Sequence, residues 1–69
     1  MYKYYLNRNR QFESGNNHEI HKEGCIWMPF NPIDLGYHFT DQSALAKARS
    51  LGYYDADGCI HCCPSIHKE

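Results

Sequence analysis

Alternating hydrophobic and polar positions near the start of this chain predict a β-hairpin. Over residues 2–7 the side chains of Tyr2, Tyr4 and Leu6 fall on one side of an extended chain, the period of two that a half-buried strand shows. Residues 8–17 are polar and end in the turn sequence Ser-Gly-Asn-Asn, which favours a loop. We therefore expect a first strand, with Tyr2, Tyr4 and Leu6 facing the core, followed by a hairpin loop.

The hairpin should return through residues 18–21, which form the predicted second strand. Ile20 would face the core there, and His21 would lie on the opposite face or at the strand end. Gly24 can adopt backbone conformations that other residues avoid, so it permits a tight bend directly before Cys25. This bend would bring the His21 imidazole and the Cys25 thiol to the same point.

An aromatic loop and a third strand are predicted next. Two prolines exclude a helix from residues 26–32, and we expect Trp27 and Phe30 to cap a small core from this loop. Residues 33–39 alternate again and predict a strand. Its inward side chains would be Ile33, Leu35, Tyr37 and Phe39.

A helix is predicted after these strands. Thr40 is a suitable N-cap, and Asp41 complements the positive end of the helix dipole. The hydrophobic stripe at helical spacing consists of Ala44, Leu45, Ala48 and Leu51. Gly52 favours helix termination, and Pro64 suits the first position of a short helical turn further on. The small alanine side chains would let the helix lie close to a sheet.

Together these elements define an α+β fold, a small three-stranded antiparallel sheet with one packed helix. The 69 residues are expected to form one domain, residues 1–69, whose core spans about residues 2–63. A chain of this size buries only about 60% of the surface that it exposes when unfolded, so the core alone gives little stability. We therefore expect a metal ion, a disulfide or a partner to stabilise the fold.

The charge and the absence of targeting patterns narrow the classes of function. Seven Lys and Arg against eight Asp and Glu give a net charge of -1 at pH 7, without the clustered basic surface of a typical nucleic-acid binder. The N-terminus lacks the pattern of a secretory signal, and no stretch approaches the length of a membrane span. We expect a soluble cytoplasmic protein, in which thiols stay reduced and metal binding is favoured over disulfides.

Two short motifs carry the candidate chemistry. His21 and Cys25 form an H-x3-C pair, and Cys59 and Cys62 form a C-x2-C pair after the turn dipeptide Asp57-Gly58. The C-x2-C spacing lets both sulfurs of one turn point at a single metal ion. Three thiolates and one imidazole complete the tetrahedral shell of Zn²⁺ and leave no open position, which predicts a structural ion in a zinc knuckle.

Two nearby residues compete for places in this shell. His67 could replace His21, and Cys63 could replace Cys62, because His67, Cys62 and Cys63 all lie within eight residues of Cys59. The H-x3-C loop is the better geometric match, so we expect His21 to be the ligand. For Cys63 the simpler interpretation is a small buried side chain. The remaining histidines, expected at the surface or on strands, are His18, His38 and His61.

No pattern of a metal or thiol enzyme is complete in this chain. The zinc-deaminase pattern needs H-x-E followed by P-C-x-x-C, but Glu19 precedes His21 and Pro64 follows the cysteines. The sequence His-Glu-Ile-His at residues 18–21 is one residue short of H-E-x-x-H. We therefore expect neither catalysis nor a small-molecule substrate.

A weaker pattern would suit nucleic-acid binding. Arg8 and Arg10 lie in the predicted hairpin loop near Tyr5 and Phe12, and interleaved aromatic and basic side chains can stack on bases and neutralise phosphates. A solvated hairpin loop explains the same residues more simply.

The order of these motifs resembles the metal-binding module of the Ada DNA-repair protein. The matching positions, within about residues 17–63, are His21, Cys25, Gly52-Tyr53, Cys59 and Cys62. The resemblance implies a zinc-bound β-sheet with one packed helix. His21 cannot serve as the reactive metal-bound cysteine of that module, and acidic Asp55 and Asp57 replace its usual basic residues, so methyl transfer is not expected.

Residues 17–21, Leu35-Gly36 and residues 56–59 also resemble a family of short bacterial proteins with no assigned activity. The patterns together predict a non-catalytic zinc-binding domain that acts as a protein-interaction or scaffold module. The alternative is a nucleic-acid-binding module related to the Ada type.

Overall fold

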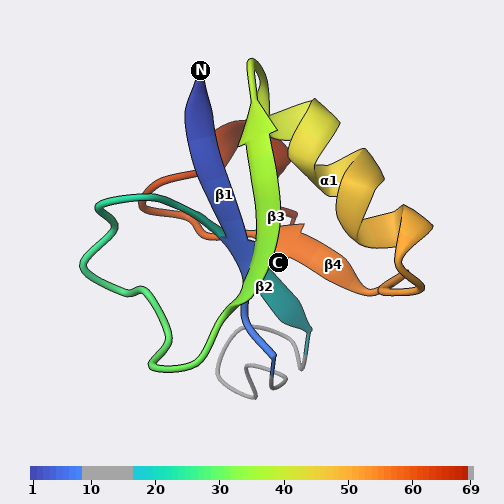
Figure 1. Cartoon of the computed structure of the whole chain (residues 1–69), viewed down its shortest axis with the longest axis horizontal. Helices are drawn as coiled ribbons and strands as arrows, with labels where there is room; N and C mark the ends of the chain where they lie inside the picture. The colour runs from blue at the N-terminus through green and yellow to red at the C-terminus, as the bar shows by residue number, and fades with distance from the viewer. Residues whose placement is uncertain (9–16, 69) are drawn as a thin grey trace.

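The computed structural model describes residues 1–8 and 17–68 of the chain (Figure 1). Its elements are, in chain order, β1 (Tyr2–Leu6), β2 (His18–Lys22), β3 (Ile33–His38), α1 (Asp41–Ser50), β4 (Ala56–Gly58) and a 3-10 helix (Pro64–Ile66). The α+β class expected from the sequence is confirmed. No helix in the described part of the chain is long and apolar enough to cross a membrane.

Within the described residues the sheet has four strands in the order β3-β1-β2-β4, one more than the sequence predicts. Strand β1 pairs antiparallel with both β2 and β3, as expected. Strand β4 pairs parallel with β2, so the prediction of a three-stranded, purely antiparallel sheet is wrong. The missed strand is only three residues long and contains an Asp-Gly dipeptide typical of a turn, so it shows no alternation from which it could be predicted.

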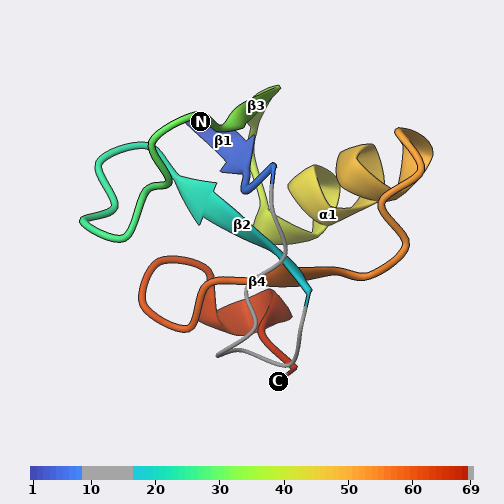
Figure 2. The same ribbon diagram turned by 90° about the horizontal axis from the view of Figure 1, so that it is seen from below.

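Helix α1 lies along one side of this sheet and contacts β3, β4 and the 3-10 helix (Figures 1 and 2). The buried residues of the core are Tyr4, Leu6, Ile20, Leu35, Ala44, Leu45, Ala48, Ala56, Cys63 and Ile66. Because Ile66 belongs to this cluster, the core extends beyond its predicted end at residue 63. Tyr2, predicted to face inward, is instead exposed, and its ring centre lies 5.1 Å from the Lys22 ammonium.

A β-bulge at Gly36 breaks the predicted alternation in β3. The register between β1 and β3 shifts here, so Leu35 is the extra residue on the bulged strand. Gly36 has a φ of 83°, the left-handed conformation that glycine adopts in one common type of bulge. Leu35 is buried as predicted, but Tyr37 and Phe39 beyond the bulge are exposed, so their predicted inward orientation is wrong.

The aromatic loop after Cys25 does not cap the core. It extends away from the sheet at the left of Figure 1, and both Trp27 and Phe30 are exposed, contrary to the prediction. Cys63 and Ile66, from the end of the chain, join the core instead. The loop thus presents large hydrophobic side chains to solvent.

Helix α1 has the caps that the sequence predicts. The Thr40 hydroxyl accepts a hydrogen bond from the Ser43 N–H at 3.1 Å, and Gly52 follows the helix with a φ of 100°. The three alanine and leucine positions of the stripe within the helix are buried. Leu51, the C-cap residue, is exposed and lies outside the core, so its predicted packing is wrong.

Asp41, at the start of α1, joins three separate elements. Its carboxylate accepts hydrogen bonds from the Tyr4 hydroxyl at 2.5 Å and from the Ser65 hydroxyl at 2.7 Å, and it lies 3.5 Å from the Lys22 ammonium. Burial opposes ionisation of Asp41, but the hydrogen bonds and the ammonium together outweigh it and lower the pKa of this carboxyl. Asp41 therefore connects the sheet, the helix and the 3-10 helix through one charged group.

Replacing this carboxylate should measurably weaken the fold. We expect Asp41→Asn to lower the free energy of unfolding by about 1–3 kcal/mol, because charge-assisted hydrogen bonds are lost in a half-buried position. The measurement is urea unfolding of both variants and the unaltered protein under the same conditions. Asp34→Asn is the matched control, since the Asp34 carboxylate pairs with Lys3 at an exposed position where an ion pair contributes little. Equal effects of the two changes would contradict the role assigned to Asp41.

Candidate metal centre

The structure brings His21, Cys25, Cys59 and Cys62 together at one point. One donor atom from each residue lies within 4.8 Å of the donor atoms of the other three, so the cluster can hold a metal ion. These are the four residues that the two sequence motifs predict as ligands. His21 comes from β2, Cys25 from the turn after it, and the other two cysteines from the segment after β4.

The parallel pairing of β2 with β4 places the two motifs side by side. Ile20 of β2 pairs with Gly58 of β4, and the Cys59 N–H donates a hydrogen bond to the Ile20 carbonyl at 3.0 Å. Parallel strands run in the same direction, so the residues that follow each strand emerge at the same edge of the sheet. His21, still within β2, and Cys59, just after β4, each come one residue after this pair, so they lie side by side at that edge.

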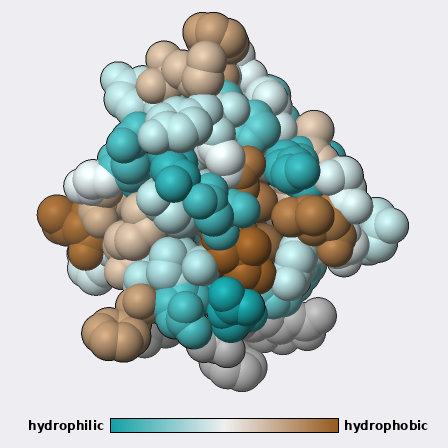
Figure 3. Space-filling view, in the orientation of Figure 1, coloured by the Kyte–Doolittle hydropathy of each residue, from teal (hydrophilic) through white to brown (hydrophobic). Residues whose placement is uncertain are grey.

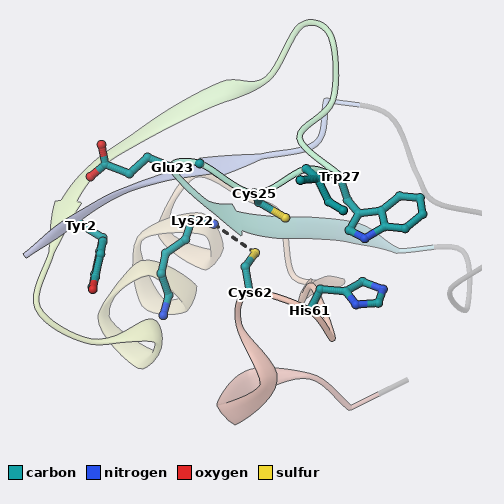
Figure 4. A pocket seen from close by; sticks show the side chains of 9 residues that line it. Tyr2, Lys22, Glu23, Cys25, Trp27, His61 and Cys62 are labelled. Atoms are coloured by element: carbon teal, nitrogen blue, oxygen red, sulfur yellow. Dashed lines mark hydrogen bonds between the residues drawn. The ribbon is translucent and has the colours of Figure 1, made fainter.

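Two tight turns then return the remaining cysteines to this edge. Gly24, with a φ of 85°, lies in the first turn, which is closed by a hydrogen bond from the Cys25 N–H to the Lys22 carbonyl. In the second turn the Cys63 N–H donates to the Cys59 carbonyl at 2.8 Å. The Lys22 N–H also donates to the Cys62 sulfur at 3.2 Å, a contact that stabilises negative charge on a thiolate (dashed line in Figure 4).

Gly58 permits the close approach of the chain segment after the second turn. A Cβ at this position would overlap the Ile66 side chain and the Cys63 carbonyl oxygen. Any larger residue would therefore push the 3-10 helix and the second turn away from β4. Gly58, which made β4 look like a turn in the sequence, is thus required by the packing of Ile66 and Cys63 against β4.

The distances within the cluster suit a four-coordinate ion. The Cys25 and Cys59 sulfurs lie 4.0 Å apart, and the Cys62 sulfur lies 4.0 Å from His21 Nδ1. A tetrahedron with metal–sulfur bonds of about 2.3 Å has edges of about 3.8 Å. The donors present in this chain therefore fit a tetrahedral metal ion with little rearrangement.

Burial divides the ligands into two classes. His21 and Cys59 are fully buried, whereas Cys25 and Cys62 are partly exposed. Both partly exposed cysteines line an open pocket on the protein surface. Figure 4 shows their sulfurs near each other at its centre. Trp27 and His61 lie to one side, and Tyr2, Lys22 and Glu23 lie to the other. The cluster is therefore enclosed by protein on one side and reachable from the other.

The environment of the cluster keeps its thiols protonated when no metal is bound. Burial raises the pKa of the Cys59 thiol to about 12 and also raises the pKa of Cys25. Hydrogen bonding with Cys63, followed by burial, raises the pKa of Cys62 to about 11. A metal ion must therefore displace a proton from each thiol, and its binding must weaken as the pH falls.

The two alternative ligands lie outside the cluster. The His67 Nδ1 hydrogen-bonds to the Gly58 carbonyl at 2.9 Å and lies 3.6 Å from the Asp57 carboxylate. Cys63 is fully buried in the hydrophobic core, as its simpler interpretation requires, although its sulfur lies 3.8 Å from that of Cys62. The structure therefore favours His21 over His67.

The other three histidines also lie outside the cluster of four donors. His18 Nδ1 contacts the Asp55 carboxylate at 2.9 Å, and His38 contacts Ser43 at 2.8 Å. His61 is exposed and stacks on Trp27, with 5.3 Å between the ring centres. His61 thus lines the pocket. The sequence, which only places it between Cys59 and Cys62, did not predict this.

Of the two arginines considered for nucleic-acid contact, only Arg8 is described by the structure. Its Nε donates a hydrogen bond to the Asn31 carbonyl at 3.3 Å. Arg10 and Phe12 lie outside the described residues.

Sequence reasoning also missed Glu19. This residue is buried, and its carboxylate lies 3.4 Å from His21 Nε2. The sequence could have indicated this contact, because Glu19 and His21 are two residues apart in a predicted strand and such side chains point to the same side.

Comparisons of this chain with protein-family models, with curated proteins and with solved structures found no match. The case for the metal centre therefore rests on the geometry of its own residues.

Metal binding should release protons from all three cysteine ligands. We expect one proton per thiol at pH 7, measured by calorimetric titration with Zn²⁺ in buffers of different ionisation enthalpy. Cys25→Ser should release one proton fewer than the unaltered protein, since a serine hydroxyl does not ionise at this pH. Binding heats that do not depend on the buffer would contradict the assignment of protonated thiols as ligands.

Proposed function

We propose that this chain is a small non-catalytic domain built around one structural zinc ion. The observation that supports this most directly is the convergence of His21, Cys25, Cys59 and Cys62, whose donor atoms all lie within 4.8 Å of one another. Three thiolates and one imidazole are a common ligand set of structural zinc sites. Four protein donors also fill a tetrahedral shell, so no position is left at which the ion could activate water or a substrate.

A structural ion suits the energetics of this fold. The strands are short, from three to six residues, and the core they share with α1 is small. Zinc binding contributes about 10–16 kcal/mol to the folding of small zinc-dependent peptides, as much as the whole stability of a typical domain, about 5–15 kcal/mol. The proposal also assigns the protein to a reducing compartment such as the cytoplasm, where thiols remain available as ligands.

We further propose that the domain binds another protein through the loop beside the ion. We call the exposed residues Ile26, Trp27, Phe30 and His61 the Trp27 surface. Ile26 is 88% exposed, Trp27 57% and Phe30 106%, and hydrophobic atoms stand out over this loop at the left edge of Figure 3. Covering a large apolar side chain contributes about 1.5–3 kcal/mol, so a partner would gain substantially by burying this loop.

The ligand order supports a proposed relationship to Ada-type metal-binding modules. The relationship would not extend to methyl transfer, because His21 takes the place of the reactive cysteine. Nucleic-acid binding has less support than protein binding, since the Arg8 guanidinium already bonds to the loop carbonyl of Asn31.

Removing the metal should unfold the domain. We expect native mass spectrometry under reducing conditions to show one zinc ion per chain, and a strong chelator to abolish the dispersed amide resonances of the folded protein. Cys59→Ser should greatly weaken zinc binding. Cys63→Ala should retain one zinc ion, because Cys63 lies outside the four-residue cluster. Dispersed resonances that persist without metal would refute a structural role for the ion.

A partner should contact the Trp27 surface specifically. We expect a photo-crosslinking amino acid at Phe30 to capture one defined protein, and the same substitution at Tyr54 to capture none of it. Tyr54 is a matched control because it is also a highly exposed aromatic residue, located after α1 and far from the loop in sequence. Trp27→Ala should reduce the capture from position 30 at least several-fold while leaving zinc stoichiometry at one. Equal capture from both positions, or none from position 30, would argue against this surface.

A further inference from the structure

Glu19 forms a buried pair with His21, one of the four residues of the candidate metal site. They are neighbours on the same side of β2, because side chains two residues apart on a strand point the same way. Glu19 Oε1 lies 3.4 Å from His21 Nε2, and the two side chains are 9% and 0% exposed. The pair is therefore shielded from water, which could otherwise satisfy its polar atoms.

The two ring nitrogens of His21 face different surroundings. Nδ1 lies 4.0 Å from the Cys62 sulfur and so faces the other donors. Nε2 faces Glu19 and makes no hydrogen bond within the described part of the chain. A buried N–H without an acceptor costs about 1–3 kcal/mol, and the Glu19 carboxylate, 3.4 Å away, can act as the acceptor for a proton on Nε2.

We infer that Glu19 is a positioning residue for the metal centre: it holds the Nε2 proton of His21 and thereby presents Nδ1 to the ion. The inference rests on the proposed zinc site. A neutral imidazole carries its proton on one nitrogen and can bind a metal only through the other. A carboxylate beside Nε2 fixes the proton there and fixes the orientation of the ring.

The identity of the residue matters for this role. A carboxylate can only accept a hydrogen bond, so it selects one tautomer of His21 and disfavours the other. It also increases the electron density on the imidazole, which strengthens the bond from Nδ1 to a cation. The alternative arrangement, with Nε2 bound to the ion, would require the ring to turn and would leave the Glu19 carboxylate buried beside Nδ1 or unpaired.

The assignment of the two nitrogens can be tested in the unaltered protein. In the zinc-loaded, ¹⁵N-labelled protein, long-range ¹H–¹⁵N correlation spectra should show the His21 proton on Nε2 and zinc bound through Nδ1. Zinc bound through Nε2 would overturn the inference and leave the proposed zinc domain intact. A protein that binds no zinc under reducing conditions would reject both.

Two substitutions test whether Glu19 supports the metal. We expect Glu19→Ala to weaken zinc binding by about 10–100-fold in competition with a chromophoric chelator, the usual effect of losing a partner of a metal-bound histidine. Glu19→Gln should recover most of this loss, since its amide oxygen can still accept the Nε2 proton. Glu23→Ala is the control, because this neighbouring carboxylate is exposed and hydrogen-bonds to the Lys3 N–H instead of a ligand.

The outcomes separate a positioning role from a general effect of charge or folding. Zinc affinity of Glu19→Ala within about twofold of the unaltered protein would refute the role. So would equal losses in Glu19→Ala and Glu23→Ala. If Glu19→Ala does not fold, the spectra of the unaltered protein still decide, because zinc bound through Nε2 there would contradict the inference.

Discussion

The pairing of β2 with β4 is the constraint on which the rest of this structure depends. It is parallel, so the chain leaves both strands at the same edge of the sheet, and the residues beyond Ile20 and Gly58 meet there. A strand of three residues has few hydrogen bonds of its own. An ion held by His21 in β2, by the turn after β2 and by the segment after β4 would secure this pairing, and the pairing in turn brings the donors within reach of one ion. Binding of such an ion and formation of the sheet would therefore be coupled in one folding event.

Local signals explain which elements were predictable from the sequence. Alternation identified β1 and β3, and the hairpin loop after β1 identified β2 as the returning strand. The N-cap Thr40 and the glycine at position 52 identified α1. The spacing of the Cys and His residues identified the cluster, because ligand spacing reflects the turn geometry that a metal requires. Strand β4 could not be found in this way. Among the residues that the structure describes, β4 pairs only with β2, which is far away in sequence. The close approach of Ile66 demands a glycine within β4.

The errors in predicted burial have a different cause. The hydrophobicity of a side chain determines the free energy that its burial would contribute, but not whether the fold has a position in the core for it. The bulge at Gly36 reverses the alternation of β3 and exposes Tyr37, and the loop after Cys25 carries Trp27 away from the core. Ile66, near the end of the chain, takes a place in the core that the aromatic loop was expected to fill. Glu19 was missed because its importance depends on the burial of the ring beside it.

The exposed aromatic surface and the ligand cluster are structurally connected. Trp27 follows Cys25 by two residues, and His61 directly precedes Cys62, so each ring is attached to a different ligand turn. Their stacking, with ring centres 5.3 Å apart, requires both turns to be held together, as an ion shared by the two turns would do. If the cluster holds an ion, its loss would remove this constraint on the two turns and on the stacked rings. A partner that contacts this stacked pair would consequently bind the metal-loaded form in preference. By linkage, the bound partner would also raise the affinity of the domain for the ion.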